Sequence, residues 1–205
     1  MTAEVHLGPL APSDVRDLAR LHRRAFPGFF LSTLGEPFLV QFYRGFLQDD
    51  TAVTVVARDK HGMPRGAVVG TTEPAGFFGR LVTNRWPGFV TASARAMLTN
   101  PKAAPRLVRA LTYRGNTPAG ATGALLSSHF VDPTYQGGGV GSLLIDEWAR
   151  VAASMGAERA FLITDAISNE AANRFYRARG WQLADTYDTR EGRQMNRYTT
   201  SLDAH

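Results

Sequence analysis

A glycine-rich stretch, Gln136-Gly137-Gly138-Gly139-Val140-Gly141-Ser142, constrains the fold more than any other part of the 205-residue chain. It follows an apolar run from Ala124 to Val131. The apolar residues after it have the spacing of one helix face: Val140, Leu143, Leu144, Trp148, Val151, Ala152 and Met155. The pattern predicts a strand, a glycine turn and a helix. Because glycines let the backbone approach a ligand closely, and the N–H groups of a helix N-terminus attract phosphate oxygens, the turn is a candidate phosphate-binding site.

Two well-known phosphate-binding patterns do not match this turn. A Walker loop requires a lysine before its Ser or Thr, and no lysine lies between Gly137 and Ser142. The dinucleotide fingerprint G-x-G-x-x-G has no clean copy here. The pattern that fits is Q-x-x-G-x-G, read as Gln136, Gly139 and Gly141. With it, the chain resembles the GNAT superfamily of acyl-CoA-dependent N-acyltransferases, in which this turn holds the pyrophosphate of coenzyme A. A glycine turn that only packs tightly is the alternative.

A second stretch strengthens the resemblance. The segment from Asn169 to Trp181 is similar to the family's second signature, an Asn-led helix that carries a tyrosine and ends at Gly-aromatic. Asn169, Asn173 and Tyr176 stand at i, i+4 and i+7, so they share one helix face. Gly180 suits the position that follows a helix C-terminus. The two signatures occur in the family's order.

The resemblance covers residues from about Thr122 to Tyr187, and upstream it is topological only. It implies an α/β (α+β) GNAT fold, with a mixed, mostly antiparallel sheet of six to seven strands and helices on both faces. We expect residues 1–205 to form a single domain. The expected elements are a strand at 5–10, a helix from 15 to 26, a helix from about 37, a hairpin of 51–58 and 66–72, strands at 124–131 and 159–164, and a terminal strand pair at 181–186 and 195–202.

A long segment separates the hairpin from the fourth strand, and we expect a helical, basic insertion at residues 74–121. Helical spacing covers Trp86 to Leu98 and Pro105 to Tyr113. Residues 74–131 contain no Asp or Glu but seven of the 23 Lys and Arg residues, so the remainder has 16 basic and 18 acidic residues. The basic surplus of the chain therefore belongs to this segment.

Three interpretations of the insertion remain open. Its apolar face packs on the domain or on a dimer partner, with solvated arginines. Alternatively, it caps the acceptor site and attracts an anionic substrate, such as a nucleotide-linked sugar, or coenzyme A itself. A third interpretation is binding to an anionic membrane surface, since a basic amphipathic helix with Trp and Phe has that composition. No nucleic-acid-binding module is visible. The aromatic segment from Phe29 to Leu47 has two interpretations as well, core or acceptor pocket.

The resemblance implies direct attack of an amine on an acyl-CoA thioester, without an acyl-enzyme. Such a reaction needs a bound carrier, a neutral amine, a stabilised oxyanion and a proton for the leaving thiolate. The resemblance gives Tyr176 the role of the acid, and a phenol with a pKa near 10 stays protonated at pH 7; a packed aromatic is the alternative. The candidate contacts of coenzyme A are Phe130, Val131, Gln136, Gly137, Gly138, Gly139, Val140, Gly141, Ser142, Asn169, Asn173 and Tyr176.

The general base is less well defined. His129 lies two residues before Val131, and strand alternation would place it on one face with Ser127 and Leu125. Imidazole, with an ordinary pKa of about 6.5, could take a proton from the amine. Glu73, Asp132 and a water chain are rival bases, and a satisfied polar residue is the plain alternative for His129. For Asn169, helix capping is the alternative to a contact with coenzyme A.

Composition excludes other classes of chemistry. The chain has no cysteine, which rules out disulfides, thiolate nucleophiles and Cys-based metal sites. Its five histidines lack ligand spacing, so we expect no metal. The N-terminal residues lack the features of a secretory signal, and no apolar run approaches the roughly 18 residues of a membrane span, so we expect a cytoplasmic protein.

The sequence therefore predicts an N-acetyltransferase that moves an acetyl group from acetyl-CoA to the primary amine of a small molecule. An anionic amino sugar is one candidate acceptor. The alternatives are a non-catalytic acyl-CoA-binding sensor or interaction module, and an acetyltransferase for protein or peptide amines. The oligomeric state is expected to be monomer or homodimer.

Overall fold

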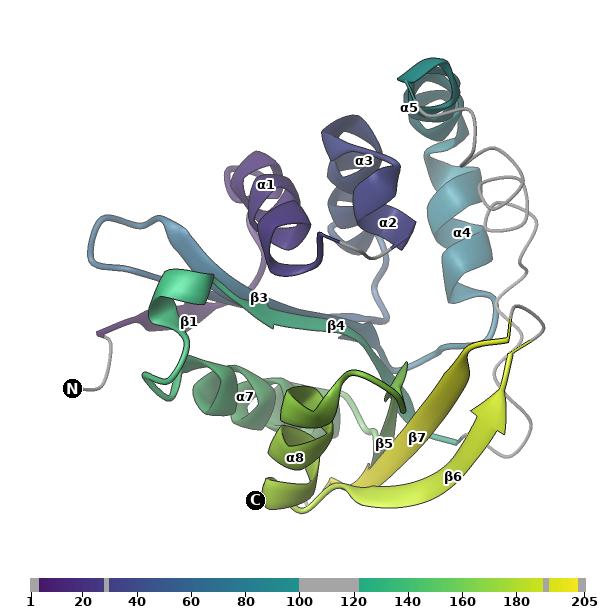
Figure 1. The fold of residues 1–205 in the computed structure, drawn as a ribbon. Coiled ribbons are helices and arrows are strands. Elements are labelled where there is room, and N and C mark those ends of the chain that lie inside the picture. Colours follow the sequence, from purple (N-terminus) through teal and green to yellow (C-terminus); the bar gives the residue numbers. More distant parts are fainter. Residues whose placement is uncertain (1–3, 28–29, 100–121, 190–191, 203–205) are drawn as a thin grey trace.

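A seven-stranded sheet runs through the molecule in the order β1-β2-β3-β4-β5-β7-β6 (Figure 1). The computed structural model describes residues 4–27, 30–99, 122–189 and 192–202. The strands are β1 (His6–Gly8), β2 (Ala52–Arg58), β3 (Pro64–Thr71), β4 (Ala124–Val131), β5 (Arg159–Asp165), β6 (Gln182–Asp188) and β7 (Gln194–Ser201). Neighbouring strands are antiparallel except β4 and β5, which are parallel. The predicted mixed, mostly antiparallel sheet is thus confirmed.

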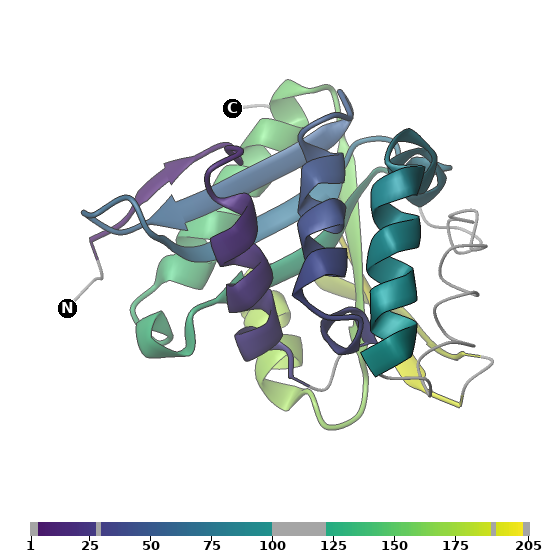
Figure 2. The same cartoon turned by 90° about the horizontal axis from the view of Figure 1, so that it is seen from above.

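Helices cover both faces of the sheet (Figures 1 and 2). One face carries α1 (Val15–Ala25), α2 (Phe30–Thr33), α3 (Glu36–Phe46), α4 (Phe77–Asn84) and α5 (Trp86–Thr99). The other face carries α7 (Val140–Ser154) and α8 (Glu170–Ala178), and the short 3₁₀ helix η2 (Pro133–Tyr135) precedes α7. The predicted strand, glycine turn and helix are all present, and β4 has the predicted bounds.

Each face of the sheet has its own hydrophobic core. Under α7, Trp148 is fully buried and its Nε1 donates to the carbonyl oxygen of Val53 at 3.1 Å. Under α1 and α3, the core contains Phe42, Tyr43 and Phe46. These three aromatic residues of the 29–47 segment are therefore core residues, which supports the first of the two interpretations of that segment.

The two helices between β3 and β4 pack on α3. The rings of Phe89 and Phe38 form an edge-to-face contact with centroids 5.1 Å apart. Arg80 is bound to the Asp49 carboxylate, with Nε and Oδ2 2.9 Å apart, and Arg85 donates to Gln41 at 3.0 Å. The helix expected from Trp86 is present as α5, whereas α4 was not expected. The helix expected at 105–113 lies outside the described residues. The packing supports the first interpretation of the insertion.

A β-bulge changes which side chains of β4 share a face. The register pairs Val69 with Ser128 but Gly70 with Leu126, so Ser127 is the extra residue on β4. As a result, Leu126 belongs to the core under α7, whereas Phe130 belongs to the core under α1. The expectation of strict alternation from Leu125 to His129 is therefore wrong, since one added residue reverses the faces.

Replacing Gly70 tests how tightly α7 sits on this part of the sheet. A Cβ at Gly70 would lie 2.2 Å from the Leu125 carbonyl oxygen and 2.6 Å from Cζ2 of Trp148. We expect Gly70→Ala to lower the free energy of unfolding by about 1–3 kcal/mol, because the neighbouring backbone and indole must shift. The matched control is Gly79→Ala in α4, where a Cβ meets nothing within 4 Å. Urea unfolding compares the two, and equal midpoints would contradict the packing described.

Candidate active site

β4 and β5 separate after a short paired region. They pair only from Ala124 with Ala160 to Leu126 with Leu162. Beyond this point β4 continues to pair with β3, and β5 with β7. The backbone groups of residues 127–131 that point towards β5 therefore have no strand partner in the part of the chain that the structure describes, and buried backbone groups require a partner. The open edge is about 16 Å long at roughly 3.3 Å per residue, which suits an extended ligand that offers hydrogen bonds.

The glycine turn lies at the end of this open edge. Gly137 and Gly139 have φ values of 77° and 82°, in the left-handed region that favours glycine. The N–H of Leu143 donates to the Gly139 carbonyl oxygen at 3.1 Å, so the N–H groups of residues 140–142 precede the first hydrogen bond of α7. A Cβ at Gly137 would meet nothing within 4 Å. The turn thus combines N–H groups that have no acceptor within α7 with open space beside Gly137, an arrangement that suits phosphate oxygens.

The structure brings His129 and Tyr176, the two predicted catalytic residues, together on the α7 and α8 side of the sheet. Their ring centroids are 6.2 Å apart, and the Phe175 ring lies 5.3 Å from that of His129. Tyr176 is buried, which raises its pKa, so the hydroxyl remains protonated at neutral pH. Burial also lowers the pKa of His129 to about 4, although the Gly141 backbone opposes this shift. His129 is therefore neutral.

One atom of His129 has no partner. Its Nε2 is shielded from solvent and has no hydrogen-bond partner among the described residues. This nitrogen points at the glycine turn, since a Cβ on Gly141 would lie 3.6 Å from it. The nearest group is the Gly141 backbone, which already acts on the pKa of His129, and a ligand atom beside the turn would offer this nitrogen a better partner.

Asn173 is occupied by other protein groups. Its Nδ2 donates to the carbonyl oxygens of Asp165 at 2.9 Å and Asn169 at 2.8 Å. Its Oδ1 accepts from Asn196 and from the Tyr198 hydroxyl, each at 2.9 Å. These four bonds use the donors and acceptors of the amide, so Asn173 ties α8 to β5 and β7.

The side chains of Gln136 and Asn169, the other two predicted amide residues, make different hydrogen bonds. Gln136 is exposed, and its Nε2 donates to the carbonyl oxygen of Val131 at 3.4 Å. Asn169 is the N-cap residue of α8, but its side chain makes no capping bond and donates instead to Thr164 Oγ1 at 2.6 Å. Only Gln136 therefore has a side chain within the turn.

A buried polar chain that the sequence analysis missed lies on the opposite face of β4. His22 Nδ1 and the Tyr43 hydroxyl are 2.6 Å apart, and Tyr43 also interacts with the Ser128 side chain. Burial lowers the pKa of His22 to about 4. Burial raises the pKa of Tyr43, with the hydrogen bond to Ser128 opposing it. The signal in the sequence is a histidine on the apolar face of α1, next to Leu18 and Leu21.

The two rival bases are placed differently. Burial tends to raise the pKa of Asp132, but hydrogen bonds from Thr134 and the charges of Arg24 and Arg65 outweigh it, so the pKa lies below its ordinary value. Glu73 is exposed just beyond β3, near the start of the open edge of β4.

Within the described ranges, no three His, Asp or Glu side chains gather as metal ligands. No helix in those ranges is both long and apolar enough to cross a bilayer.

Comparisons with solved structures agree with this fold. Several solved structures share the fold at low identity. A putative acetyltransferase of the GNAT family from Desulfovibrio desulfuricans has 16% identity over 98% of this chain and 100% of that one, with a TM-score of 0.63. The ribosomal-protein-S18-alanine N-acetyltransferase from Escherichia coli has 15% identity over 98% and 96%, with a TM-score of 0.60. A putative acetyltransferase from Salmonella typhimurium, solved with its cofactor acetyl-CoA, has 12% identity over 99% and 96%, with a TM-score of 0.62.

The family is shown by the sequence itself. No curated protein sequence matches the chain. Residues 16–181 match the model of the acetyltransferase (GNAT) family. Because this match spans most of the chain, the protein belongs to the GNAT acetyltransferase family and is an acyl-CoA-dependent N-acetyltransferase.

Proposed function

We propose that the protein transfers the acetyl group of acetyl-CoA to the primary amine of a small molecule. The observation that carries the proposal is the open edge of β4, which leads directly into the free amides of the glycine turn. In the proposed complex, residues 136–142 hold the diphosphate, and the backbone around Phe130 and Val131 pairs with the amide-containing arm. The thioester then lies near the bulge at Ser127, about 16 Å from the turn.

The residues present fit such a carrier. The N–H groups of residues 140–142 would donate to the diphosphate oxygens, and Gln136 lies beside them. His129 Nε2, which has no partner within the described residues, would gain one from a molecule lying along β4. Asn173 is not included in our proposed contacts, because its hydrogen bonds are already made within the protein.

The bound thioester supplies an activated acyl carbon, and the protein supplies positioning and protons. The amine nitrogen forms the new C–N bond while the C–S bond breaks, and the sulfur leaves as a thiolate. Tyr176 donates its hydroxyl proton to this sulfur. Backbone N–H groups of β4 beside the bulge are the proposed donors to the developing oxyanion.

The proton of the amine needs a separate acceptor. Burial lowers the pKa of His129 and of His22 alike, to about 4, and Asp132 is held by arginines, but only His22 is joined to β4 by a chain of hydroxyl groups. We therefore place this step on the other face of β4: the amine proton passes to Ser128, the Ser128 proton to Tyr43, and the Tyr43 proton to neutral His22. The amine then approaches from the α1 and α3 side, and the aromatic side chains there exclude water.

Gly137→Ala tests the diphosphate site. The matched control is Gly156→Ala, because both glycines have positive φ, 77° and 89°, and neither Cβ would meet an atom within 4 Å. Both variants carry a similar backbone strain of about 1–2 kcal/mol. We expect only Gly137→Ala to weaken acetyl-CoA binding, by about tenfold or more, since only its Cβ would enter the open space of the turn in which we place the diphosphate. Calorimetric titration measures the affinity, and an equal effect of both variants would argue against the site.

Tyr176→Phe tests the acid. The substitution keeps the ring that contacts His129 but removes the hydroxyl. We expect kcat to fall by about 100-fold, the effect of a lost general acid, with unchanged acetyl-CoA affinity. Release of free coenzyme A across an amine panel that includes amino sugars and peptides is the readout. An unchanged kcat removes Tyr176 from the role, and binding without turnover of any amine favours the sensor alternative.

Tyr43→Phe tests the proton path against its rivals. We expect this variant to lower kcat by about 10- to 100-fold, because general base catalysis typically contributes that much or more. His129→Gln and Glu73→Gln serve as controls, and their kcat should stay within about threefold of the wild-type value.

The pH profile gives a second test of the proton path. Burial lowers the pKa of His22 to about 4, so His22 is neutral above this pH. We therefore expect kcat at saturating substrates to stay flat from pH 7 to about pH 5 and to fall below it, as His22 gains its own proton. Because the pKa of His129 is also about 4, the variants decide between the two histidines: an acid limb that persists in Tyr43→Phe and is lost in His129→Gln would identify His129 as the base.

A further inference from the structure

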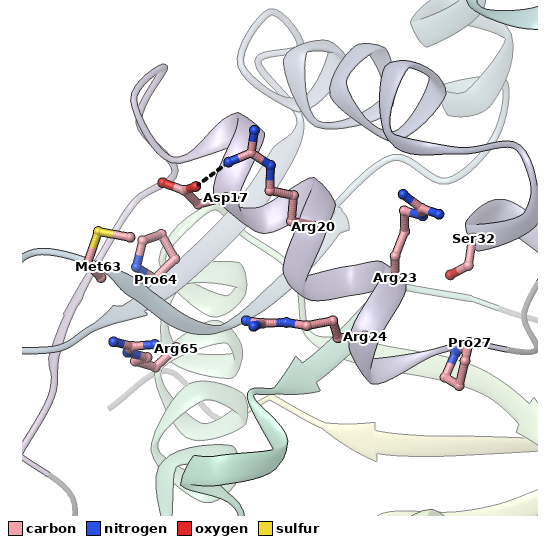
Figure 3. Close-up of a pocket in the computed structure, with 9 residues that line it drawn as sticks. All are labelled: Asp17, Arg20, Arg23, Arg24, Pro27, Ser32, Met63, Pro64 and Arg65. Atoms are coloured by element: carbon pink, nitrogen blue, oxygen red, sulfur yellow. Dashed lines mark ion pairs between the residues drawn. The ribbon is translucent and has the colours of Figure 1, made fainter. Parts of the chain in front are cut away.

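A pocket of about 720 Å³ opens beside α1 and the β2–β3 hairpin (Figure 3). Its lining contains four arginines and one carboxylate: Arg20, Arg23, Arg24, Arg65 and Asp17. The first three arginines lie on one face of α1, and Arg65 comes from β3. The pocket is absent from the sequence prediction, which placed the basic surplus in residues 74–121.

A buried hydroxyl without a partner also lines the pocket. Ser32, on the short helix α2, is only 7% exposed, and its Oγ has no solvent contact and no hydrogen-bond partner among the described residues. Such a group costs about 1–3 kcal/mol when it stays unpaired. In Figure 3, Ser32 and Arg23 lie together at one end of the pocket. The hydroxyl is therefore in position to donate to a ligand that Arg23 attracts.

The arginines differ in how far their charge is already neutralised. Arg20 pairs with Glu36 at 3.2 Å and with Asp17 at 3.6 Å. Arg23, in contrast, is exposed and makes no ion pair with any residue in the described part of the chain. The free positive charge of the pocket is thus concentrated next to the unpaired Ser32 hydroxyl.

At the other end, two guanidinium groups share one carboxylate oxygen. Asp132 Oδ2 lies 3.2 Å from Arg24 Nη2 and 3.5 Å from Arg65 Nη1. Arg65 is also bound to Asp59 at 2.8 Å. Asp132 follows the last residue of β4 directly, and its carboxylate caps η2, which leads into the glycine turn. The pocket therefore adjoins the end of the open edge at which we place the diphosphate.

From these observations we infer that the pocket binds a phosphate ester. Guanidinium groups and a hydroxyl are the donors that proteins use for phosphate oxygens, and Arg23 and Ser32 supply both at one end. Arg24 and Arg65 form the wall nearest the glycine turn. A volume of about 720 Å³ accommodates a phosphate together with part of the molecule that carries it.

A phosphate ester here has two possible sources. One is the ribose phosphate of coenzyme A, whose nucleotide end lies near the turn in the proposed complex. The other is a phosphorylated acceptor amine. The choice between these sources rests on the proposed function, whereas the site itself does not, because the pocket and its unpaired groups exist without any assumption about acetyl transfer.

The experiment uses inorganic phosphate as the probe, titrated into the full chain and followed by calorimetry. We expect Arg23→Gln and Ser32→Ala each to weaken phosphate binding by about tenfold, since each removes one strong donor. The control is Arg16→Gln, which removes the same charge from α1 but does not line the pocket. Equal phosphate affinity in the wild type and in both pocket variants would overturn the inference, as would an equal loss in Arg16→Gln.

A second comparison identifies the source. If the pocket takes the ribose phosphate, coenzyme A should bind more tightly than 3′-dephospho-coenzyme A in the wild type but not in Arg23→Gln, and saturating coenzyme A should exclude inorganic phosphate. If it takes an acceptor phosphate, inorganic phosphate should still bind to the coenzyme A-saturated protein, and Arg23→Gln should leave both carrier affinities unchanged. Failure of the proposed function, seen as no acetyl-CoA binding or no turnover, leaves the phosphate titration readable on its own.

Discussion

The site depends on the separation of β4 from β5 after Leu126. β4 is held by β3 up to Val131, and β5 is held by β7 up to Asp165, so the two parallel strands share only three residue pairs. Strands twist relative to one another, and two strands that follow different partners diverge. Their divergence leaves backbone donors and acceptors unused in the middle of a sheet, where they would otherwise be paired. In the proposed complex, a ligand with amide groups would pair with β4 at this point.

The position of α7 links this opening to the core. Two glycines of β3 let the helix lie close to the sheet, since a Cβ at Gly66 would be 2.9 Å from Leu144 Cδ1 and one at Gly70 would be 2.6 Å from Trp148 Cζ2. Trp148 then anchors the helix through its bond to Val53. Because the far end of the same helix carries the free amides, packing in the core fixes where an anion can bind. The core and the binding site therefore cannot vary independently.

The sequence predicted the parts of this arrangement that depend on local pattern. The strand 124–131, the glycine turn and the following helix were predicted because apolar spacing and glycines act within a few residues. The bulge at Ser127 was not, since it depends on how β3 pairs with β4. Likewise, the partners of Asn173 include Asn196 and Tyr198, which β7 brings in from more than 20 residues away. Such long-range contacts have no signature in spacing.

The position of an unpaired positive charge was the property that the sequence predicted least well. The basic surplus of residues 74–121 suggested an anion site there; of its described side chains, Arg80 is bound to the Asp49 carboxylate and Arg85 to the Gln41 amide, and the other basic side chains lie outside the described part. The pocket arginines come instead from α1, where Asp17 is the one acidic residue among four arginines, and from β3. What matters for binding is which guanidinium remains unpaired in the folded chain, and pairing is a tertiary property.

The bulge also organises the chemistry on the two faces of β4. After Ser127, successive side chains point to opposite sides, so Ser128 joins Tyr43 and His22 whereas His129 joins Phe175 and Tyr176. In the proposed mechanism, one strand thus lies between the hydroxyl that would protonate the thiolate and the chain that would accept the proton of the amine. This arrangement would let each group reach its own reacting atom, the sulfur on one side of β4 and the amine nitrogen on the other. The carrier between β4 and β5 would then meet the acid on one side of the strand and the amine on the other.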